Sequence, residues 1–423
     1  MGERGSRAEV AERLKARFLR ALQEDNAGEV LEILRTTNFD TDTVLDVEDR
    51  DMILASYKQG YWLPGHKLES SWAMGIHVCM MYDSLECAQV LLQRGAAINR
   101  KPNGKTPLHV ACEVSRADCV ALLLEHGARV NSLSLSGHTP LHYCVTKESL
   151  HCAKQLILKG AKINMPSQNN DEDTPLHAAS RFGVPELVGL YASNGANLDA
   201  VNSRQETPLI TAAFWAYCTR SQTFSTEHHL VCRMLLDCGA QPDLHEEDHK
   251  TALHKAAWNC DHTLMEMLLV AGANPRNMDV NGCSPIQYVV KVSEVRHFAA
   301  PEICFQLLLN HGAPRIYPPQ FHKVLQSCRE SPKAIEVMVN SYEHLKPTRK
   351  WRPAVPDATY ERHKDFYDSL FAVCGNTPRT LMHLARCAVR AQMFDRCHAG
   401  VEKLAVPPSL RGYLLLEPEG ILY

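Results

Sequence analysis

The 423-residue chain carries 45 basic and 48 acidic side chains, which leaves a formal net charge of −3. This near-balance gives no sign of a polyanion-binding protein, so nucleic acid is not an implied partner. The apolar runs fall short of the ~18 residues that a membrane-spanning helix needs, and the N-terminus is charged rather than signal-like. We therefore expect no membrane partner and a cytoplasmic or nuclear location. The length fits two or three domains or one long repeat array.

Residues 1–73 are predicted to form an N-terminal helical segment with a degenerate repeat and an aromatic cap. Residues 8–20 place apolar side chains on one side of a helix, and residues 18–34 indicate two short helices of a worn repeat unit. The start of the chain fits the short pattern for N-myristoylation at Gly2, but an acidic third residue is a poor context for it. An aromatic cluster outside the repeat is predicted to be an ordered cap rather than a partner-binding loop, because an exposed cluster promotes aggregation. Its residues are Tyr57, Tyr61, Trp62, Pro64 and Trp72.

Two markers recur in phase through the middle of the chain. Thr-Pro-Leu-His, or a relative of it, begins at Thr106, Thr139, Thr174, Thr207, Thr251 and Ser284, and Gly-Ala follows at Gly95, Gly127, Gly160, Gly195, Gly239, Gly272 and Gly312. Their period of about 33 residues resembles that of the ankyrin repeat. We therefore predict an all-α fold, an ankyrin-repeat solenoid with short β-hairpin fingers. The array is expected to span residues 74–315 in about seven repeats.

The repeat markers have a structural explanation. Thr106 caps a helix whose first residue is Pro107, where the missing N–H costs nothing. His109 lies one turn later, within reach of the Thr106 hydroxyl, so its ring can tie one repeat to the next. Gly127 permits the left-handed turn that ends the second helix. Because the histidines recur with the repeat, each is predicted to be structural rather than a catalytic base: His109, His142, His177 and His254.

No other pattern indicates catalysis. The chain has no Gly-rich phosphate loop and no G-x-S-x-G motif, so we expect a non-enzyme without a cofactor. Its 16 cysteines contain no C-x-x-C pair and are interpreted as reduced, small apolar residues. One loose group fits no standard zinc module, so a structural use is preferred over metal binding. It consists of Cys218, Cys232, Cys238, His228 and His229.

Departures from the repeat indicate where a target protein could bind. About eleven extra residues fall near Cys218 to His228 and about seven between Lys291 and Pro301, and such insertions form loops on one face. Finger tips and first helices of such arrays line a concave surface. The substrate-binding candidates on it are Lys105, His138, Arg204, Phe214, Trp215, His249 and Trp258. The alternative is that the polar ones are merely solvated and the aromatic ones belong to the core.

Residues 316–375 keep helix-length apolar periods but lose both markers, which is typical of capping helices. Prolines at residues 346–356 break the helical pattern, and residues 357–374 predict one more helix. This segment is interpreted as capping helices and a linker.

Residues 376–417 predict a small unit of three helices. Leu381, Ala385 and Val389 lie on one stripe of the first helix, a second short helix follows, and a Pro-Pro break precedes a third apolar run ending at Tyr413. A unit of about 40 residues seldom stabilises itself, so the stripe needs a partner. The segment resembles the SOCS box, which carries substrate receptors into elongin B/C and cullin-based ubiquitin ligases.

The resemblance assigns roles to individual residues. The elongin-binding positions would be Thr380, Leu381, Leu384, Ala385 and Val389. The cullin-binding positions would be Leu404, Val406, Pro407, Leu410, Tyr413 and Leu414. Ala385 replaces the usual Cys, a small-for-small change, whereas Ala405 replaces a Pro and leaves the choice of cullin open.

The order of the segments resembles the ankyrin-repeat and SOCS-box family over essentially the whole chain. That resemblance implies a substrate-recognition subunit of an elongin B/C–cullin–RING E3 ubiquitin ligase. The array would bind an unknown protein substrate, and the box would recruit elongin B/C and a cullin-five-type scaffold with its RING protein, leading to ubiquitination and degradation. The chain itself would contribute effective concentration and geometry rather than covalent chemistry.

Two other interpretations stay open. A plain ankyrin scaffold, or sequestering protein, would bury the stripe of the first C-terminal helix against the array as a helical cap. The fingers could also be substrates for asparaginyl hydroxylation, since Asn99, Asn131 and Asn164 occupy matching positions, where Asp199 and Asp243 later replace asparagine.

Overall fold

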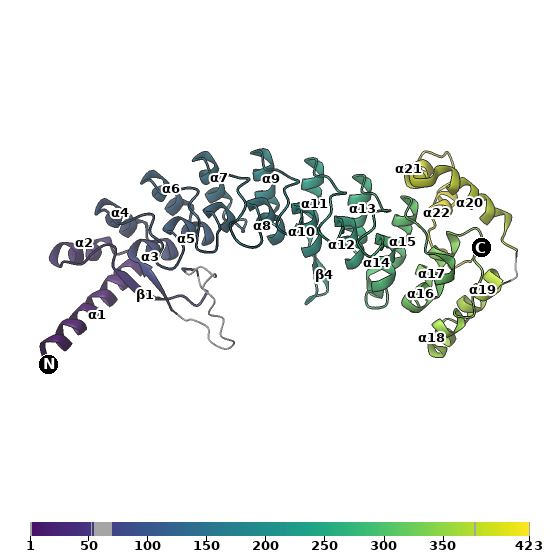
Figure 1. Cartoon of the computed structure of the whole chain (residues 1–423), viewed down its shortest axis with the longest axis horizontal. Helices are drawn as coiled ribbons and strands as arrows, with labels where there is room; N and C mark the ends of the chain where they lie inside the picture. Colours follow the sequence, from purple (N-terminus) through teal and green to yellow (C-terminus); the bar gives the residue numbers. More distant parts are fainter. Residues whose placement is uncertain (1, 52, 55–69, 376–377, 423) are drawn as a thin grey trace. The chain divides into compact units, whose positions relative to one another are not determined.

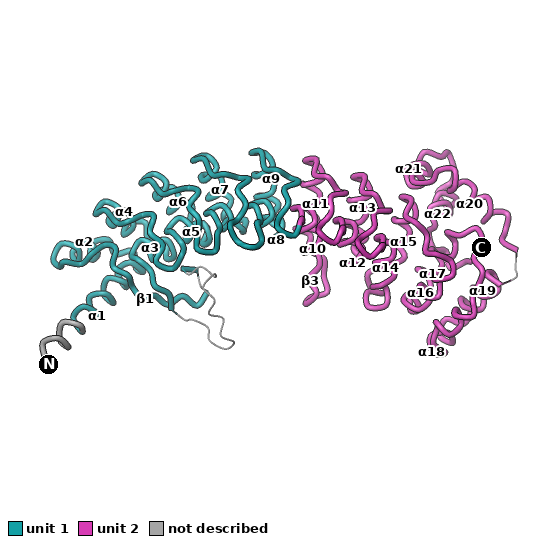
Figure 2. The backbone as a smooth tube through the Cα atoms, in the orientation of Figure 1, with its two compact units in different colours: residues 1–204 teal, residues 205–423 magenta. Residues whose placement is uncertain are grey.

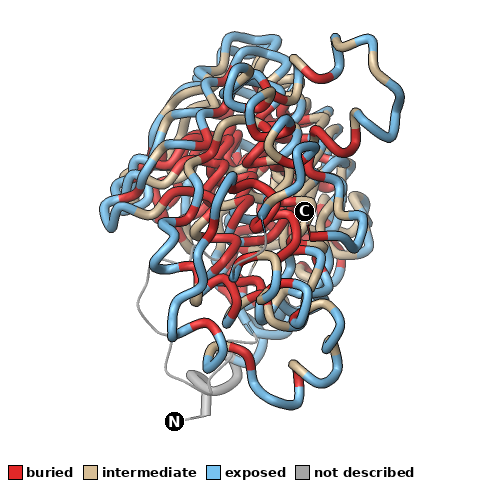
Figure 3. The backbone as a smooth tube through the Cα atoms, turned by 90° about the vertical axis from the view of Figure 1, so that its right-hand side faces the viewer, coloured by how far each residue is buried: buried red, intermediate tan, exposed pale blue. Residues whose placement is uncertain are grey.

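The computed structural model describes residues 2–51, 53–54, 70–375 and 378–422 (Figure 1). The chain forms two compact units, residues 1–204 and 205–423 (Figure 2). Buried residues gather in the interior and exposed residues lie on the outside, on loops and on the outer sides of helices (Figure 3).

The first unit is a stack of helix pairs. Its elements are α1 (Gly2–Gln23), α2 (Ala27–Thr36), β1 (Val44–Glu48), β2 (Ser70–Met74), α3 (Gly75–Tyr82), α4 (Leu85–Gln93), α5 (Pro107–Glu113), α6 (Ala117–Glu125), a 3-10 turn (Pro140–Tyr143), α7 (Leu150–Leu158), α8 (Pro175–Phe182) and α9 (Pro185–Ser193). The pair α1/α2 packs on α3/α4 as a repeat would, although α1 is longer than the short helix expected there.

Two local features of this unit differ from the expectation. Strands β1 and β2 pair antiparallel, with Val44 opposite Met74, and β1 alternates exposed and buried residues in the way of a half-buried strand. The repeat that begins at Thr139 replaces its first helix by a single 3-10 turn. Side chains of Thr146 and Ser149 bond to each other's backbone directly after it and compete with helical hydrogen bonds.

Most of the expected aromatic cap lies outside the described residues, namely Tyr57, Tyr61, Trp62 and Pro64. Its last member, Trp72, is on β2 and is 65% exposed. In the part that the structure describes, the aromatic ring therefore faces solvent, unlike a ring in a buried cap.

The second unit continues with helix pairs and ends in a cluster of short helices. Its elements are α10 (Pro208–Trp215), β3 (Tyr217–Cys218), β4 (Thr223–Phe224), α11 (Thr226–Asp237), α12 (Ala252–Asn259), α13 (His262–Val270), α14 (Pro285–Val292), a 3-10 turn (His297–Ala299), α15 (Pro301–Asn310), a 3-10 turn (Pro318–Gln320), α16 (Phe321–Ser327), α17 (Pro332–Asn340), a 3-10 turn (Arg352–Ala354), α18 (Asp357–Arg362), α19 (Lys364–Gly375), α20 (Leu381–Met393), a 3-10 turn (Phe394–Arg396), α21 (Cys397–Glu402) and α22 (Pro408–Leu414).

Both insertions lie between the two helices of a repeat, as the spacing predicts. The first forms the β3–β4 hairpin, and the second contains the 3-10 turn before α15. Arg296 in the second insertion contacts the first, because its guanidinium lies 4.0 Å from the ring centroid of Tyr217. It also donates to the carbonyl oxygen of Asn259 at the end of α12 (2.7 Å).

Beyond the last Gly-Ala marker, α16 and α17 form one more helix pair. The linker after them is anchored by Trp351, which is fully buried beside Phe321. The single helix expected over residues 357–374 is two helices, α18 and α19, because the chain bends at His363. This bend lets the rings of Tyr360 and Tyr367 stack at 5.4 Å.

Candidate functional site

Helix α20 is the first helix of the box, and its two faces differ in polarity and in burial. Thr380 caps it, since its hydroxyl accepts a hydrogen bond from His383 N (3.2 Å). On the outer face, Leu381 is 85% exposed, and Ala385 and Ala388 are exposed as well. This face is apolar and has no covering segment among the described residues.

The inner face of α20 is polar and buried. It consists of His383, Arg386, Cys387 and Arg390. Arg390 donates to the side-chain oxygen of Asn310 (2.6 Å) and to the carbonyl oxygen of Leu414 (2.7 Å). His383 lies 2.9 Å from the carbonyl oxygen of Tyr342 through Nε2. Burial, with the nearby Arg379 and Arg386, lowers the pKa of His383 to about 4, so its ring is neutral at pH 7 and Nε2–H donates this bond.

A small apolar core holds the three C-terminal helices together. Cys397, Val401 and Leu414 are buried in it, and the partly buried side chains that pack on them are Val389, Met393, Leu404 and Leu415. Val389 therefore packs into the interior of the box. The exposed apolar stripe of α20 runs from Leu381 through Ala385 to Ala388.

The expected elongin-binding residues are thus divided. Thr380, Leu381 and Ala385 are exposed, whereas Leu384 and Val389 are half-buried. The first three lie on the open face of α20.

The expected cullin-binding residues are divided as well. Pro407 is exposed just before α22, Leu410 is 38% exposed, and Leu404 and Val406 are half-buried. Tyr413 and Leu414 are only 4% and 6% exposed. Their side chains fill the interior of the box, and their assignment to a cullin surface stays a prediction. Tyr413 lies beneath the guanidinium of Arg386, 4.2 Å from its ring centroid.

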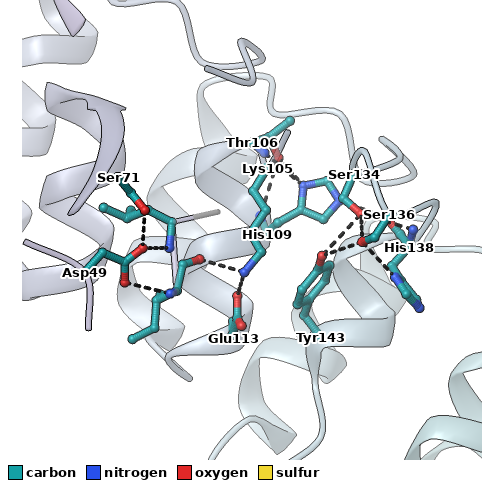
Figure 4. A network of polar contacts seen from close by, with 12 residues as sticks. Asp49, Ser71, Lys105, Thr106, His109, Glu113, Ser134, Ser136, His138 and Tyr143 are labelled. Carbon is teal, nitrogen blue, oxygen red and sulfur yellow. Dashed lines mark hydrogen bonds and ion pairs between the residues drawn. The ribbon is translucent and has the colours of Figure 1, made fainter. Parts of the chain in front are cut away.

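Lys105 also differs from the expectation of a finger residue open to a substrate. It is 1% exposed, and its ammonium donates to the carbonyl oxygen of Ile53 (2.7 Å) and pairs with Glu113 (Figure 4). Burial lowers the pKa of Lys105 and raises that of Glu113. Lys105 therefore binds the segment after β1 to α5.

The other polar candidates lie closer to solvent. His138 is half-buried, with Nδ1 3.0 Å from the hydroxyl of Ser136 in the network that also contains Tyr143 (Figure 4). Arg204 and His249 are exposed. His249 has a φ of +59°, in the left-handed region, at the turn of its finger.

The three aromatic candidates gather on α10 and α12. Phe214, Trp215 and Trp258 are 51%, 50% and 48% exposed. The rings of Phe214 and Trp215 meet edge to face at 5.6 Å, and the Lys255 ammonium lies 5.4 Å from the Phe214 centroid. About half of the surface of each of these residues is thus exposed to solvent. The second insertion adds two exposed apolar side chains that the sequence analysis did not single out, Val295 and Phe298.

Comparisons with known proteins agree with this arrangement of array and box. The family model described as SOCS box matches residues 377–415, and models of ankyrin repeats match residues 76–167 (three copies), 171–203 and 248–280. Ankyrin repeat and SOCS box protein 16 of Mus musculus is 37% identical over 365 residues, covering 86% of this chain and 78% of that protein. The chain belongs to the ankyrin repeat and SOCS box family.

Further relatives extend the comparison. Ankyrin repeat and SOCS box protein 18 of Homo sapiens is 38% identical, over 86% of this chain and 77% of that protein. A crystal structure of the human ASB11 ankyrin repeat domain aligns with 56% of this chain and 98% of its own, with 27% sequence identity and a TM-score of 0.47. The order of the segments leads us to expect a placement nearest to the fourth member of the family, with which the tail LLLEPEGILY is consistent. This finer placement stays a prediction.

Membership of the ankyrin repeat and SOCS box family confirms the predicted fold class, a helical ankyrin solenoid followed by a SOCS box. The combination of the two modules also supports a substrate-receptor role in cullin–RING ligases. The function of individual side chains follows from their geometry.

The repeat histidines act as structural links. His109 Nδ1 accepts from Thr106 N (3.1 Å), and Nε2 lies 3.0 Å from the carbonyl oxygen of His138 in the next finger (Figure 4). Burial lowers the pKa of His109 to about 3, so the ring is neutral and unsuited to acid–base catalysis near pH 7.

The finger asparagines make a second kind of link. Asn131 donates through Nδ2 to Gly160 O (3.1 Å) and accepts from Lys162 N (2.9 Å). Asn99 and Asn164 repeat this pattern with the fingers that follow them. Their hydroxylation stays a prediction.

Two further expectations concern metal and membrane. In the described ranges, no group of three or more His, Cys, Asp or Glu side chains is placed to hold a metal ion. Within the loose cluster, His229 Nε2 lies 2.7 Å from Asp261, Cys232 is buried, and Cys218 and Cys238 are exposed. Among those same residues, no helix is both long enough and apolar enough to cross a bilayer.

Proposed function

We propose that this protein is the substrate-recognition subunit of an elongin B/C–cullin–RING ubiquitin ligase, with a cullin-five-type scaffold. The observation that carries the proposal is the orientation of α20. Leu381 is 85% exposed while the charged Arg386 and Arg390 are buried. A helix that merely capped the array would face the other way, with its apolar stripe inward.

The energetics favour a protein partner on the outer face of α20. Burying one leucine side chain contributes about 2 kcal/mol, and Leu381 with its small neighbours Ala385 and Ala388 offers a groove-fitting stripe on a helix. A partner that covers this stripe gains that energy without rearranging the box. Elongin B/C is the partner that the SOCS-box family implies.

The test is co-purification of the full chain with elongin B/C and the cullin-five scaffold. Leu381→Asp should abolish elongin binding without unfolding the chain, because the side chain is already in solvent. Leu158→Asp on α7 is the matched control, since Leu158 is 84% exposed on a different module. Failure of a folded wild-type chain to bind would make the protein a scaffold instead.

The array would hold the target protein, and its contribution is to raise the effective concentration of target lysines near the ubiquitin-charged enzyme. The half-exposed rings of Phe214, Trp215 and Trp258 are the candidate anchors, since aromatic residues dominate binding hot spots. Phe214→Ser with Trp258→Ser should reduce target ubiquitination while elongin binding persists. Equal ubiquitination by this variant would remove the aromatic cluster from the proposal.

A further inference from the structure

The box is held on the last two helix pairs of the array by polar contacts at equivalent positions. Helices α15 and α17 each end in an asparagine, Asn310 and Asn340, which are 2% and 4% exposed. The carbonyl groups at the end of a helix lack intrahelical partners and carry partial negative charge. Two arginines of α20 approach these two helix ends.

Arg390 makes contacts in several directions from one guanidinium. It donates to Asn310 Oδ1 (2.6 Å), Leu309 O (3.2 Å) and Leu414 O (2.7 Å). It thereby joins the end of α15 to the end of α22. The planar, always charged fork of arginine suits such divergent acceptors better than an ammonium would.

Arg386 makes the corresponding contact one turn earlier. It donates to Asn340 O (3.2 Å) at the end of α17 and lies over the ring of Tyr413. The same two asparagines donate in the opposite direction. Asn310 Nδ2 bonds Leu415 O (2.8 Å) and Asn340 Nδ2 bonds Ile421 O (3.1 Å).

The segment after α22 completes the attachment. The buried carboxylate of Glu336, on α17, accepts from the backbone N–H groups of Glu419 (2.8 Å), Gly420 (3.1 Å) and Ile421 (3.3 Å). At the other edge, Gly312 lies so close to the box that an added Cβ would be 2.8 Å from Asp395 Cα.

We propose that Arg390 and Arg386 are positioning residues that hold the box in one orientation on the array. The burial of apolar surface is non-directional, whereas buried hydrogen bonds are directional and costly to leave unmade. The two arginines therefore determine where the outer face of α20, and anything bound to it, points relative to the substrate surface. This inference rests on the proposed function for its biological meaning, but the orientation itself can be measured without a ligase.

The experiment measures the distance between two spin labels on the full chain by pulsed electron paramagnetic resonance. The labels are carried by non-natural amino acids at Val270, which is 71% exposed on the array, and at the exposed Lys403 in the box. The variants are Arg390→Met and Asn310→Ala. The control is Arg396→Met, which changes an exposed arginine of the same box.

We expect one narrow distance distribution for the wild type and the Arg396→Met control, and a broad distribution for both Arg390→Met and Asn310→Ala. Elongin B/C affinity should stay within about twofold in all four proteins, because none of the substituted residues lies on the outer face of α20. A twofold change corresponds to less than about 1 kcal/mol. Asn310 lies outside the box, so the Asn310→Ala variant still tests the orientation of the box if Arg390→Met unfolds α20. Narrow, unshifted distributions in Asn310→Ala would overturn the inference, whereas loss of elongin binding by the wild type would overturn the proposed function alone.

A second measurement connects orientation with ubiquitin transfer. In a reconstituted ligase, the wild-type chain should modify itself at a small set of lysines, and Asn310→Ala should spread the modification over more lysines at an unchanged elongin affinity. Mass spectrometry of the modified peptides gives the pattern. An identical lysine pattern in both proteins would show that Asn310 and Arg390 do not determine which lysines receive ubiquitin.

Discussion

His109 Nε2 lies 3.0 Å from the carbonyl oxygen of His138, a residue of the next repeat. The same link recurs from His77 to Lys105 O (3.1 Å), from His142 to Asp173 O (2.9 Å) and from His254 to Cys283 O (3.2 Å). In each case the ring is buried and neutral, and its N–H satisfies a carbonyl group of the following finger. The array therefore depends on uncharged imidazole at several points.

Stability should consequently fall in mild acid. Burial lowers the pKa of His109 to about 3 and of His77 and His142 to about 4, below the unfolded value of about 6.5. A lowered folded-state pKa contributes stability that is complete above pH ~6.5 and is lost as the pH falls toward the folded value. The loss at pH 5 is about 2 kcal/mol per histidine.

His109→Gln should make urea unfolding less sensitive to pH between 7.5 and 5. Glutamine can occupy this position, since Gln287 accepts from Ser284 N (2.7 Å) at the equivalent place in a later repeat. An equally steep dependence on pH in the variant would argue against the histidine as its source.

The pair Lys105 and Glu113 predicts a non-additive result. Lys105→Met should lower the free energy of unfolding by about 3 kcal/mol, because it leaves the carboxylate of Glu113 without its partner. Adding Glu113→Leu should recover most of that loss, since an apolar pair needs no charge compensation. Thermal melting of both single variants and the double variant gives the coupling, and additive losses would contradict it.

Tyr413 and Pro407 should behave differently although both belong to the segment assigned to cullin. Tyr413→Ala removes a ring that is 4% exposed and should destabilise the box by about 3 kcal/mol. Faster hydrogen exchange in α20 would report this. Pro407→Ala changes an exposed residue and should reduce cullin binding while elongin binding and exchange stay as in the wild type. Unchanged exchange in Tyr413→Ala would place that ring outside the structural core.

Asparaginyl hydroxylation should add one oxygen atom at Asn99, Asn131 and Asn164, the positions with matching finger geometry. Asp243 takes the same place and accepts from Asn274 N (2.8 Å), yet it offers no amide. Peptide mass spectrometry of protein from cells tests this. Absence of the oxygen from all three peptides would rule it out.

The repeat could be predicted because its determinants are local. Thr106 and His109 form a reciprocal cap within one turn, so the sequence spacing reports the geometry directly. The two insertions could likewise be located from the interrupted period. Strand β1 alternates exposed and buried residues over only five positions, and the segments before it carry the stronger helical pattern.

Other features depend on contacts that no local pattern shows. Lys105 occupies a finger position, and the segment that buries it lies far earlier in the chain, at Ile53. In α20, Leu381 and Ala385 of the expected stripe are exposed, whereas Val389 packs into the interior of the box. The opposite face of the helix follows a different rule. Two arginines at i and i+4, such as Arg386 and Arg390, usually indicate a solvated helix face. Here they are buried because they bond to the helix ends at Asn340 and Asn310.

The attachment of the box also determines the order of folding. The link from His109 to His138 spans 29 residues, whereas the contact between Asn310 and Leu415 spans 105. Closing the longer loop costs about 1 kcal/mol more in chain entropy, and during synthesis it must wait until the tail has left the ribosome. Each unit can add its helix pairs as they emerge. The outer face of α20 therefore reaches its final position only after the helix pairs that precede it have formed.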